Sequence, residues 1–89
     1  MQTQTITIIN KLGLHARAAA KLVTLASQYQ CKIELQRNQR TVNGKSIMAV
    51  MLLAASKGTE LEVRTDGEDE AVAMDSILEL INNRFDESE

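Results

Sequence analysis

The sequence predicts a two-layer α+β fold, in which three helices cover one face of an antiparallel four-stranded sheet. Four short segments alternate apolar and polar residues, and three longer segments repeat apolar residues at helical spacing. Each predicted strand therefore has one apolar face and each predicted helix has one apolar stripe, and two packed layers bury both. The element order is β-α-β-β-α-β-α. With 89 residues, of which 44% are hydrophobic, we expect one domain over residues 1–89.

The first strand and the first helix flank a short loop. Residues 5–9 are rich in β-branched side chains and place Ile6 and Ile8 on one face, as in a strand. Residues 10–13 form a loop, in which Gly13 can adopt backbone conformations that other residues resist. Residues 16–28 lack glycine and proline, and their apolar stripe predicts a helix. The stripe consists of Ala19, Leu22, Val23 and Ala26.

The middle of the chain predicts a hairpin followed by a second helix. Residues 31–36 alternate in polarity, and residues 37–39 turn into a short strand that ends near Val42. After a turn at residues 43–44, Ser46 is a favourable N-cap for a helix from residue 47 to about residue 56. Lys57 and Gly58 are suited to end this helix. Its apolar positions are Ile47, Val50, Met51 and Ala54, and the core is the first assignment for Met48 and Met51, with a contact patch second.

A fourth strand and a third helix complete the pattern. Residues 60–65 alternate in polarity, and residues 66–67 form a turn. Three acidic residues at positions 68–70 open the last helix, where negative charge is favourable. Its predicted buried stripe consists of Ala71, Met74, Ile77, Leu78, Ile81 and Phe85. Residues 86–89 are expected to be a frayed acidic tail.

Composition excludes several classes of function. The chain is acidic overall and has one Tyr and one Phe for stacking, which argues against nucleic-acid binding. No apolar run approaches the roughly 20 residues of a membrane span, and no signal peptide is recognisable. The single cysteine, Cys31, suits a reducing cytoplasm. One His and one Cys are too few for a structural zinc site, so no metal or cofactor is expected.

His15, the only histidine, is a candidate phosphoryl acceptor. It precedes the first helix, where free backbone N–H groups and the helix dipole favour anions. Histidine titrates near pH 6.5 and can be a neutral nucleophile in the cytosol. A phosphorylated ring would lie beside the N–H groups of Ala16 and Arg17, and the Arg17 guanidinium could add a charge-assisted hydrogen bond. The alternative, more common from position alone, is an exposed or capping histidine without a function.

The charge distribution and the other polar residues favour a protein on which partner enzymes act. Residues 1–50 carry seven basic and one acidic residue, and residues 51–89 carry three basic and eleven acidic ones. Lys11, Arg17 and Lys21 could steer an acidic protein partner, or they are an ordinary solvated helix face. Ser46 is either a plain N-cap or a phosphorylation site, where a phosphate would meet a helix N-terminus. No nucleophile-base-orienter set of an enzyme is recognisable.

Two motifs identify a family resemblance. Residues 13–20 read GLHARAAA and residues 43–48 read NGKSIM, and both resemble the signatures of HPr, the histidine-containing phosphocarrier of the bacterial phosphotransferase system. The resemblance covers essentially the full length. It implies an open-faced β-sandwich with the sheet order 1-4-2-3 and three helices on one face.

The resemblance also implies the function. His15 takes a phosphoryl group on Nδ1 from enzyme I, ultimately from phosphoenolpyruvate, and passes it to a histidine of an enzyme IIA component. Arg17 stabilises the phosphoryl group, and in several branches a kinase phosphorylates Ser46. The implied apolar docking residues are Ala20, Ile47, Met48 and Met51. We expect a monomer that binds no nucleic acid or membrane.

Some positions depart from the family pattern. Ala18 stands where proline is common, and Thr24, Ser27 and Ala49 stand where sugar-system carriers often have lysine. The last three positions leave the identity of the enzyme IIA partner open. The alanine-rich signature at residues 13–20, together with the ending at residues 81–87, looks closer to the nitrogen-related branch, NPr. A sugar-transport HPr with regulatory phosphorylation of Ser46 is one alternative. A regulatory paralogue that carries no phosphate is another, and the presence of His15 with Arg17 argues against it.

Overall fold

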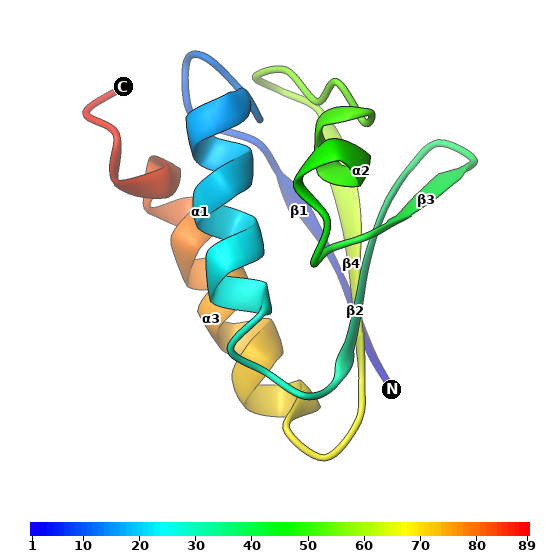
Figure 1. Cartoon of the computed structure of the whole chain (residues 1–89). Coiled ribbons are helices and arrows are strands. Elements are labelled where there is room, and N and C mark those ends of the chain that lie inside the picture. Colours follow the sequence, from blue (N-terminus) through cyan, green and yellow to red (C-terminus); the bar gives the residue numbers. More distant parts are fainter.

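In the computed structural model, which describes residues 1–89, four antiparallel strands form one sheet. The strands are β1 (Gln2–Thr7), β2 (Lys32–Arg37), β3 (Arg40–Asn43) and β4 (Glu60–Asp66), and they lie in the order β1-β4-β2-β3. The helices α1 (Ala16–Ala26), α2 (Ile47–Met51) and α3 (Glu70–Asn82) cover one face of the sheet, and a short 3₁₀ turn, η1 (Arg84–Asp86), follows α3 (Figure 1). The predicted two-layer fold and the strand order implied by the resemblance are both confirmed.

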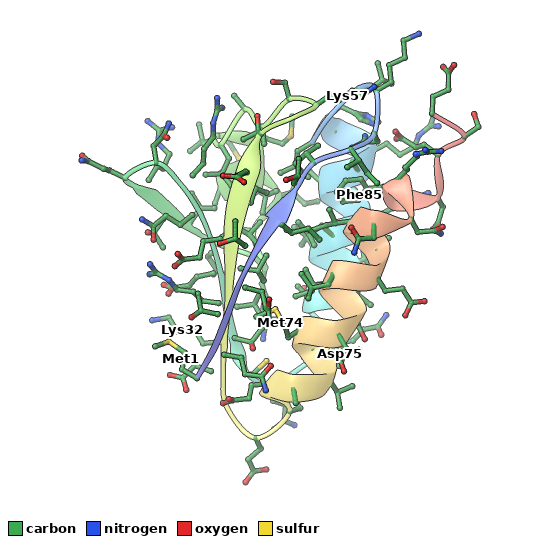
Figure 2. The ribbon with its side chains drawn as sticks, turned by 180° about the vertical axis from the view of Figure 1, so that it is seen from behind. Met1, Lys32, Lys57, Met74, Asp75 and Phe85 are labelled. Carbon is green, nitrogen blue, oxygen red and sulfur yellow. The ribbon has the colours of Figure 1, made fainter.

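The core lies between the sheet and the helices because the strand register places the apolar side chains on one face. Ile6 is paired with Leu61, and Leu35 with Val63, and all four are buried. Figure 2 shows Met74 on the side of α3 that faces the sheet, and Asp75 on the opposite side. Each large side chain buried in this way contributes about 1.5–3 kcal/mol. The other face of the sheet is polar, with Thr3, Thr5, Glu62 and Arg64.

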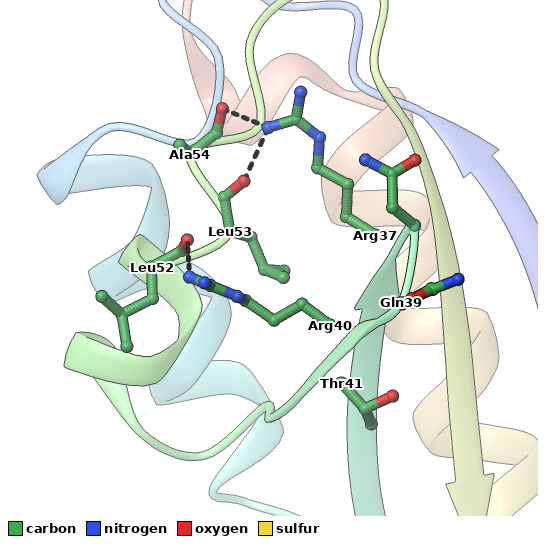
Figure 3. Close-up of a pocket in the computed structure, with 8 residues that line it drawn as sticks. Arg37, Gln39, Arg40, Thr41, Leu52, Leu53 and Ala54 are labelled. Atoms are coloured by element: carbon green, nitrogen blue, oxygen red, sulfur yellow. Dashed lines mark hydrogen bonds between the residues drawn. The ribbon is translucent and has the colours of Figure 1, made fainter.

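Helix α2 is shorter than predicted, ending at Met51 instead of near residue 56. The residues that follow leave the helix, and Ala54 adopts a left-handed conformation with φ of 49°. Two arginines of the hairpin bind the carbonyl groups there (Figure 3). Nη1 of Arg37 donates to the oxygens of Leu53 and Ala54 at 2.7 and 2.8 Å, and Nη1 of Arg40 donates to that of Leu52 at 3.0 Å. These contacts satisfy the carbonyls of the segment that follows the helix without a further helical turn, and the last carbonyls of α2 itself accept backbone N–H groups from the same segment.

The predicted core positions of α2 are therefore largely wrong. Only Val50 is buried in this helix, whereas Leu53 and Ala55 are buried after it. Gly58 does not end the helix: with φ of 91°, it lies in the turn before β4 and donates its N–H to the carbonyl of Ile8 at 2.7 Å.

Other boundaries shift by a few residues. Helix α1 ends at Ala26, and β1 runs from Gln2 to Thr7 because its polar first residues pair with β4. In α3, Ala71 is exposed and Ala73 is buried, since the buried stripe starts one position before Met74. No helix is long and apolar enough to span a bilayer.

Asp69 links the start of α3 to the start of β2. Its carboxylate accepts hydrogen bonds from the backbone N–H groups of Gln30 and Cys31, both at 2.9 Å. The bond from Gln30, followed by those involving Cys31, holds the pKa of Asp69 below its usual range despite some desolvation. Burial, with the neighbouring Asp69, raises the pKa of the Cys31 thiol.

Candidate functional site

His15 is the N-cap of α1, as predicted. Its backbone is extended, with φ of −76° and ψ of 179°, and its carbonyl accepts the N–H of Ala19 at 2.8 Å. Its side chain makes no capping hydrogen bond, so the ring is available for other contacts. The preceding residue, Leu14, donates its N–H to the carbonyl of Ala55 at 2.8 Å, which anchors the start of α1 to the segment after α2.

Gly13 allows the loop to approach this segment closely. Its φ is 68°, in the left-handed region that favours glycine. A Cβ at this position would lie 2.6 Å from the oxygen of Ala55 and 2.8 Å from Cα of Ser56. The motif therefore needs glycine here for two reasons, conformation and space.

The first turn of α1 provides an environment for an anion. The N–H groups of Ala16, Arg17 and Ala18 precede the first hydrogen bond of the helix, so they have no helical partner. The Arg17 side chain is exposed and lines the same groove, of about 850 Å³, as His15. Its guanidinium makes no hydrogen bond or ion pair within the chain, so it remains free to bind an anion beside the ring.

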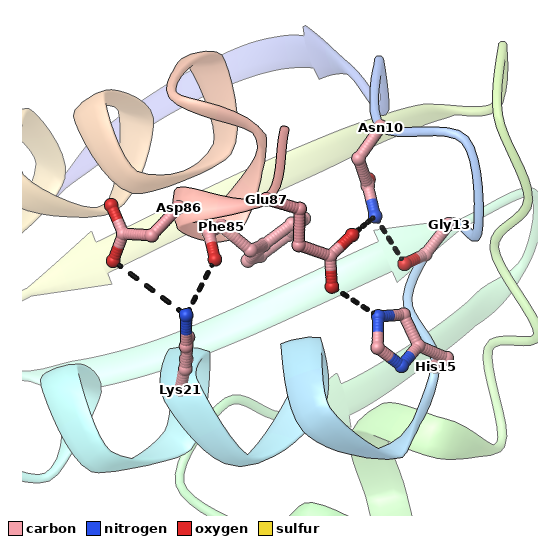
Figure 4. Close-up of polar contacts among 7 residues, drawn as sticks. All are labelled: Asn10, Gly13, His15, Lys21, Phe85, Asp86 and Glu87. Carbon is pink, nitrogen blue, oxygen red and sulfur yellow. Dashed lines mark hydrogen bonds and ion pairs between the residues drawn. The ribbon is translucent and has the colours of Figure 1, made fainter. Parts of the chain in front are cut away.

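The C-terminal residues are part of this site, and the prediction of a frayed tail is wrong. Glu87 accepts a hydrogen bond from Nε2 of His15 through Oε2 and another from Nδ2 of Asn10, at 3.0 Å, through Oε1 (Figure 4). Asn10 is fully buried and also donates to the carbonyl of Gly13 at 2.7 Å. The carboxylate thus bridges the histidine and the loop that positions it.

A left-handed turn directs Glu87 back toward His15. Arg84, Phe85 and Asp86 have φ values of 56°, 53° and 63°, which cost about 1–2 kcal/mol per residue outside glycine. Phe85 is completely buried and anchors the turn in the core. Sequence reasoning missed Glu87 because acidic terminal residues are usually solvated, and the only signal was the large apolar Phe85 just before it.

Two of the predicted basic residues are paired with the tail. Nζ of Lys21 donates to the carbonyl of Phe85 at 2.8 Å and lies 3.8 Å from Asp86. Lys11 donates its N–H to the carbonyl of Glu89 at 2.7 Å, and its Nζ lies 3.7 Å from the Glu89 carboxylate. The two lysines are therefore partly neutralised, in contrast to Arg17.

The environment of Glu87 favours its charged form. The hydrogen bond from Asn10, then that from His15 and the charges of His15 and Lys21, lower the pKa of Glu87 although its partial burial opposes this. Glu87 is therefore an ionised acceptor at neutral pH.

The residues implied as a docking surface form an exposed apolar patch on α2 with a contribution from α1. Met48 is 80% exposed, and Ile47 and Met51 are also exposed, so the core is the wrong assignment for Met48 and Met51. Ala20 is half-buried on α1, which packs beside α2. Leu52, which sequence reasoning missed, is exposed next to this patch. Ser46 caps α2 as predicted, because its Oγ accepts the N–H of Ala49 at 3.3 Å.

Comparison with known proteins decides the family. The model of the family described as "PTS HPr component phosphorylation site" matches residues 2–83 of the chain. The chain belongs to the HPr family.

Individual HPr proteins are similar over the whole length. The chain is 60% identical to phosphocarrier protein HPr of Pseudomonas aeruginosa and 54% identical to that of Neisseria meningitidis, and each alignment covers 100% of both sequences. The crystal structure of an HPr from Thermoanaerobacter tengcongensis superimposes with a TM-score of 0.96 at 39% identity, covering 100% of both chains. The chain is therefore a phosphocarrier of the phosphotransferase system. Both HPr motifs lie within the matched residues, whereas Glu87 lies outside them.

Proposed function

We propose that this HPr carries the phosphoryl group on Nδ1 of His15. Enzyme I, phosphorylated by phosphoenolpyruvate, is the donor, and a histidine of an enzyme IIA component is the acceptor. The observation that carries the proposal is the position of His15 at the start of α1: Nε2 is bound by Glu87, and the other ring nitrogen has no hydrogen-bond partner in the chain. A neutral ring in this position has a lone pair on Nδ1 for attack on phosphorus.

The residues around the ring support the acceptance of a dianion. The N–H groups of Ala16 and Arg17 are free of helical partners, and the helix dipole favours negative charge there. The unpaired guanidinium of Arg17 supplies a charge-assisted hydrogen bond to the phosphoryl oxygens. The chain contributes one nucleophile and an anion-binding environment, and the partner enzymes supply the remaining catalytic groups.

Partner proteins dock on the apolar patch in this proposal. Ile47, Met48 and Met51 are exposed on α2, whose only buried residue is Val50, and Ala20 adds to the patch from α1. Exposed methionines adapt to different partner surfaces. The protein acts as a cytoplasmic monomer. Phosphorylation of Ser46 by a kinase would introduce a dianion at the edge of this patch and regulate docking.

We assign the acceptor to the nitrogen-related branch. Thr24 and Ser27 are exposed on α1, and Ala49 is half-buried on α2, so these positions carry no charge near the docking patch. A partner that selects lysines there would bind this surface more weakly. Sugar transport is the alternative, and transfer to the enzyme IIA proteins of the same organism distinguishes the two. Faster transfer to a sugar-specific protein would overturn the branch assignment.

The carrier function is tested with the enzyme I proteins of the host and phosphoenolpyruvate. Wild type should gain one acid-labile, alkali-stable phosphate, and His15→Ala should gain none. Since the His15 side chain is half-exposed and outside the core, the thermal melt of His15→Ala should match that of wild type. One phosphate on His15→Ala would exclude His15 as the acceptor.

A further inference from the structure

The two ring nitrogens of His15 have different surroundings. Nε2 contacts Oε2 of Glu87 (Figure 4), and the Glu87 carboxylate accepts hydrogen bonds but donates none when ionised. The hydrogen of a neutral ring must therefore reside on Nε2, because only that arrangement forms the bond. Nδ1 is then left with a lone pair.

Glu87 is held in place by residues other than His15. Its Oε1 accepts the hydrogen bond from Asn10, and Asn10 is tied in turn to the carbonyl of Gly13. The Glu87 side chain is only 16% exposed, although it lies near the end of the chain. The carboxylate is thus attached to the same loop that positions the histidine, so its orientation toward the ring does not depend on the histidine alone.

We propose that Glu87 is a positioning residue for phosphoryl transfer, which keeps Nε2 of His15 protonated so that Nδ1 is the nucleophile and the phosphorylated ring is a good leaving group. The proposal rests on the proposed function of His15. It extends that function to a residue that acts through the ring and does not touch the phosphoryl group.

The chemistry of both half-reactions requires this proton. When His15 accepts the group, the Nδ1 lone pair bonds to phosphorus, the bond from phosphorus to the donor breaks, and its electron pair stays with the donor. Nε2 keeps its hydrogen, so the ring becomes a cation beside the Glu87 carboxylate. When the group leaves for the acceptor, the electron pair of the Nδ1–P bond returns to Nδ1 and a neutral imidazole departs. Without the hydrogen on Nε2, the leaving group would be an imidazolate anion, which leaves far less readily.

Other charges near the ring do not replace Glu87. The tail carboxylates Asp86 and Glu89 lie beside Lys21 and Lys11, respectively, and Arg17 is exposed and makes no contact with a tail carboxylate. The charged groups that line the site with His15 are Lys11, Arg17, Lys21, Asp86, Glu87 and Glu89. Of the carboxylates, Glu87 alone is hydrogen-bonded to the ring.

The first experiment measures the tautomer of unphosphorylated His15 from the ¹⁵N chemical shifts of its ring nitrogens. Wild type should have the hydrogen on Nε2 in the large majority of neutral molecules. Glu87→Ala removes the acceptor and should populate both tautomers, whereas Glu89→Ala, a matched change in the same tail, should resemble wild type. Equal tautomer populations in wild type and Glu87→Ala would overturn the proposal, and this measurement requires no partner protein.

The second experiment measures the loss of phosphate with pH, after phosphorylation of His15 by phosphoramidate. In wild type the fast phase of phosphate loss should persist to a higher pH than in the Glu87 variants, because the adjacent carboxylate stabilises the protonated ring of the phosphohistidine. We expect the midpoints to differ by about one pH unit or more. Glu87→Ala and the isosteric Glu87→Gln should both lower the pH midpoint of phosphate loss. At a pH just above the lowered midpoint, both variants should therefore release phosphate about tenfold more slowly than wild type. Glu87→Gln retains an acceptor oxygen and separates loss of charge from loss of shape.

An equal shift in Glu89→Ala would show a general charge effect and would overturn the specific role of Glu87. An unshifted midpoint in both Glu87 variants would overturn it as well. Failure of enzyme I to phosphorylate wild-type His15 would instead contradict the proposed function, while the tautomer measurement would still test Glu87.

Discussion

The N–H of Leu14 donates a hydrogen bond of 2.8 Å to the carbonyl of Ala55, so the residue before His15 is fixed to the segment that follows α2. This bond connects the motif at residues 13–20 to a segment that begins a few residues after the motif at residues 43–48. The loop can make it because Gly13 has no Cβ and a left-handed backbone. The orientation of the proposed phosphorylation site therefore depends on residues about forty positions away in the sequence.

Gly13→Ala should destabilise the protein and displace His15. The new Cβ would meet the oxygen of Ala55 at 2.6 Å, and the backbone would remain strained at φ of 68°, at a cost of about 1–3 kcal/mol. Gly58→Ala is the matched control, because it has a positive φ but no atom within 4 Å of the added Cβ. Chemical denaturation should show the larger loss for Gly13→Ala. Equal losses would mean that the contact with Ala55 is unimportant.

Arg17→Ala should slow phosphoryl transfer by about 10- to 100-fold, because a hydrogen bond to a charged group contributes about 1.5–3 kcal/mol. Its stability should remain within about 0.5 kcal/mol of wild type, since the exposed side chain has no partner in the chain. Arg17→Lys keeps the charge but loses the planar fork, and should be intermediate. Rapid-quench kinetics with phosphorylated enzyme I tests this series, and an unchanged rate in Arg17→Ala would remove Arg17 from the site.

Ser46→Asp should weaken transfer from enzyme I without unfolding the domain. Aspartate is a good N-cap and should keep the contact with the N–H of Ala49, so stability should stay equal or rise by up to about 1 kcal/mol. The added charge lies next to the docking patch, where it repels an acidic partner, and salt should partly restore the rate. Ser46→Ala loses the cap without adding charge and serves as the control. If Ser46→Asp and wild type have equal transfer rates at low salt, Ser46 lies outside the docking surface.

Asp69 should contribute to stability at neutral pH and lose that contribution in acid. The pKa of Asp69 is lowered in the folded protein. Its carboxylate therefore stabilises the folded state fully at any pH above the ordinary carboxyl pKa of about 4. As the pH falls through the lower, folded value, the proton binds and the stabilisation disappears. Between about pH 7 and about pH 3, the melting temperature of Asp69→Asn should therefore fall less steeply than that of wild type. At neutral pH this variant should already melt several degrees lower.

Asp75→Asn, an exposed change on the same helix, is the control for Asp69→Asn and should follow wild type. Glu70 and Glu87 also have lowered pKa values, so some acid dependence should remain in Asp69→Asn. Parallel curves for Asp69→Asn and wild type would contradict the role of Asp69.

Local sequence pattern predicts the fold well where each element buries its own apolar stripe. The strands around Ile33 and Val63 and the helix around Leu22 follow from alternation and helical spacing, because the same side chains are buried in the structure. The early end of α2 does not follow, because the carbonyls of Leu52 to Ala54, just after the helix, are bound by Arg37 and Arg40, in a separate hairpin. Apolar spacing within residues 47–56 contains no information about these partners.

One part of the candidate site is likewise predictable from local sequence, and another part is not. His15, Ala16 and Arg17 are contiguous, so the motif predicts their positions relative to the start of α1. Glu87 is 72 residues from His15 and reaches it through a left-handed turn without a glycine. Backbone preferences disfavour such a turn, and the burial of Phe85 stabilises it only in the completed fold. Sequence reasoning from local rules therefore predicts a free tail.

The strand order has a consequence for synthesis on the ribosome. β1 is made first, yet its only neighbour in the sheet is β4, whose residues 60–66 emerge much later. At about 5–20 residues per second, the first strand remains without its partner for several seconds. The hairpin of β2 and β3 and the helix α1 can form earlier, from contacts close in sequence. The sheet, and with it the proposed phosphorylation site, is therefore expected to assemble in one late step, when β4 inserts between β1 and β2.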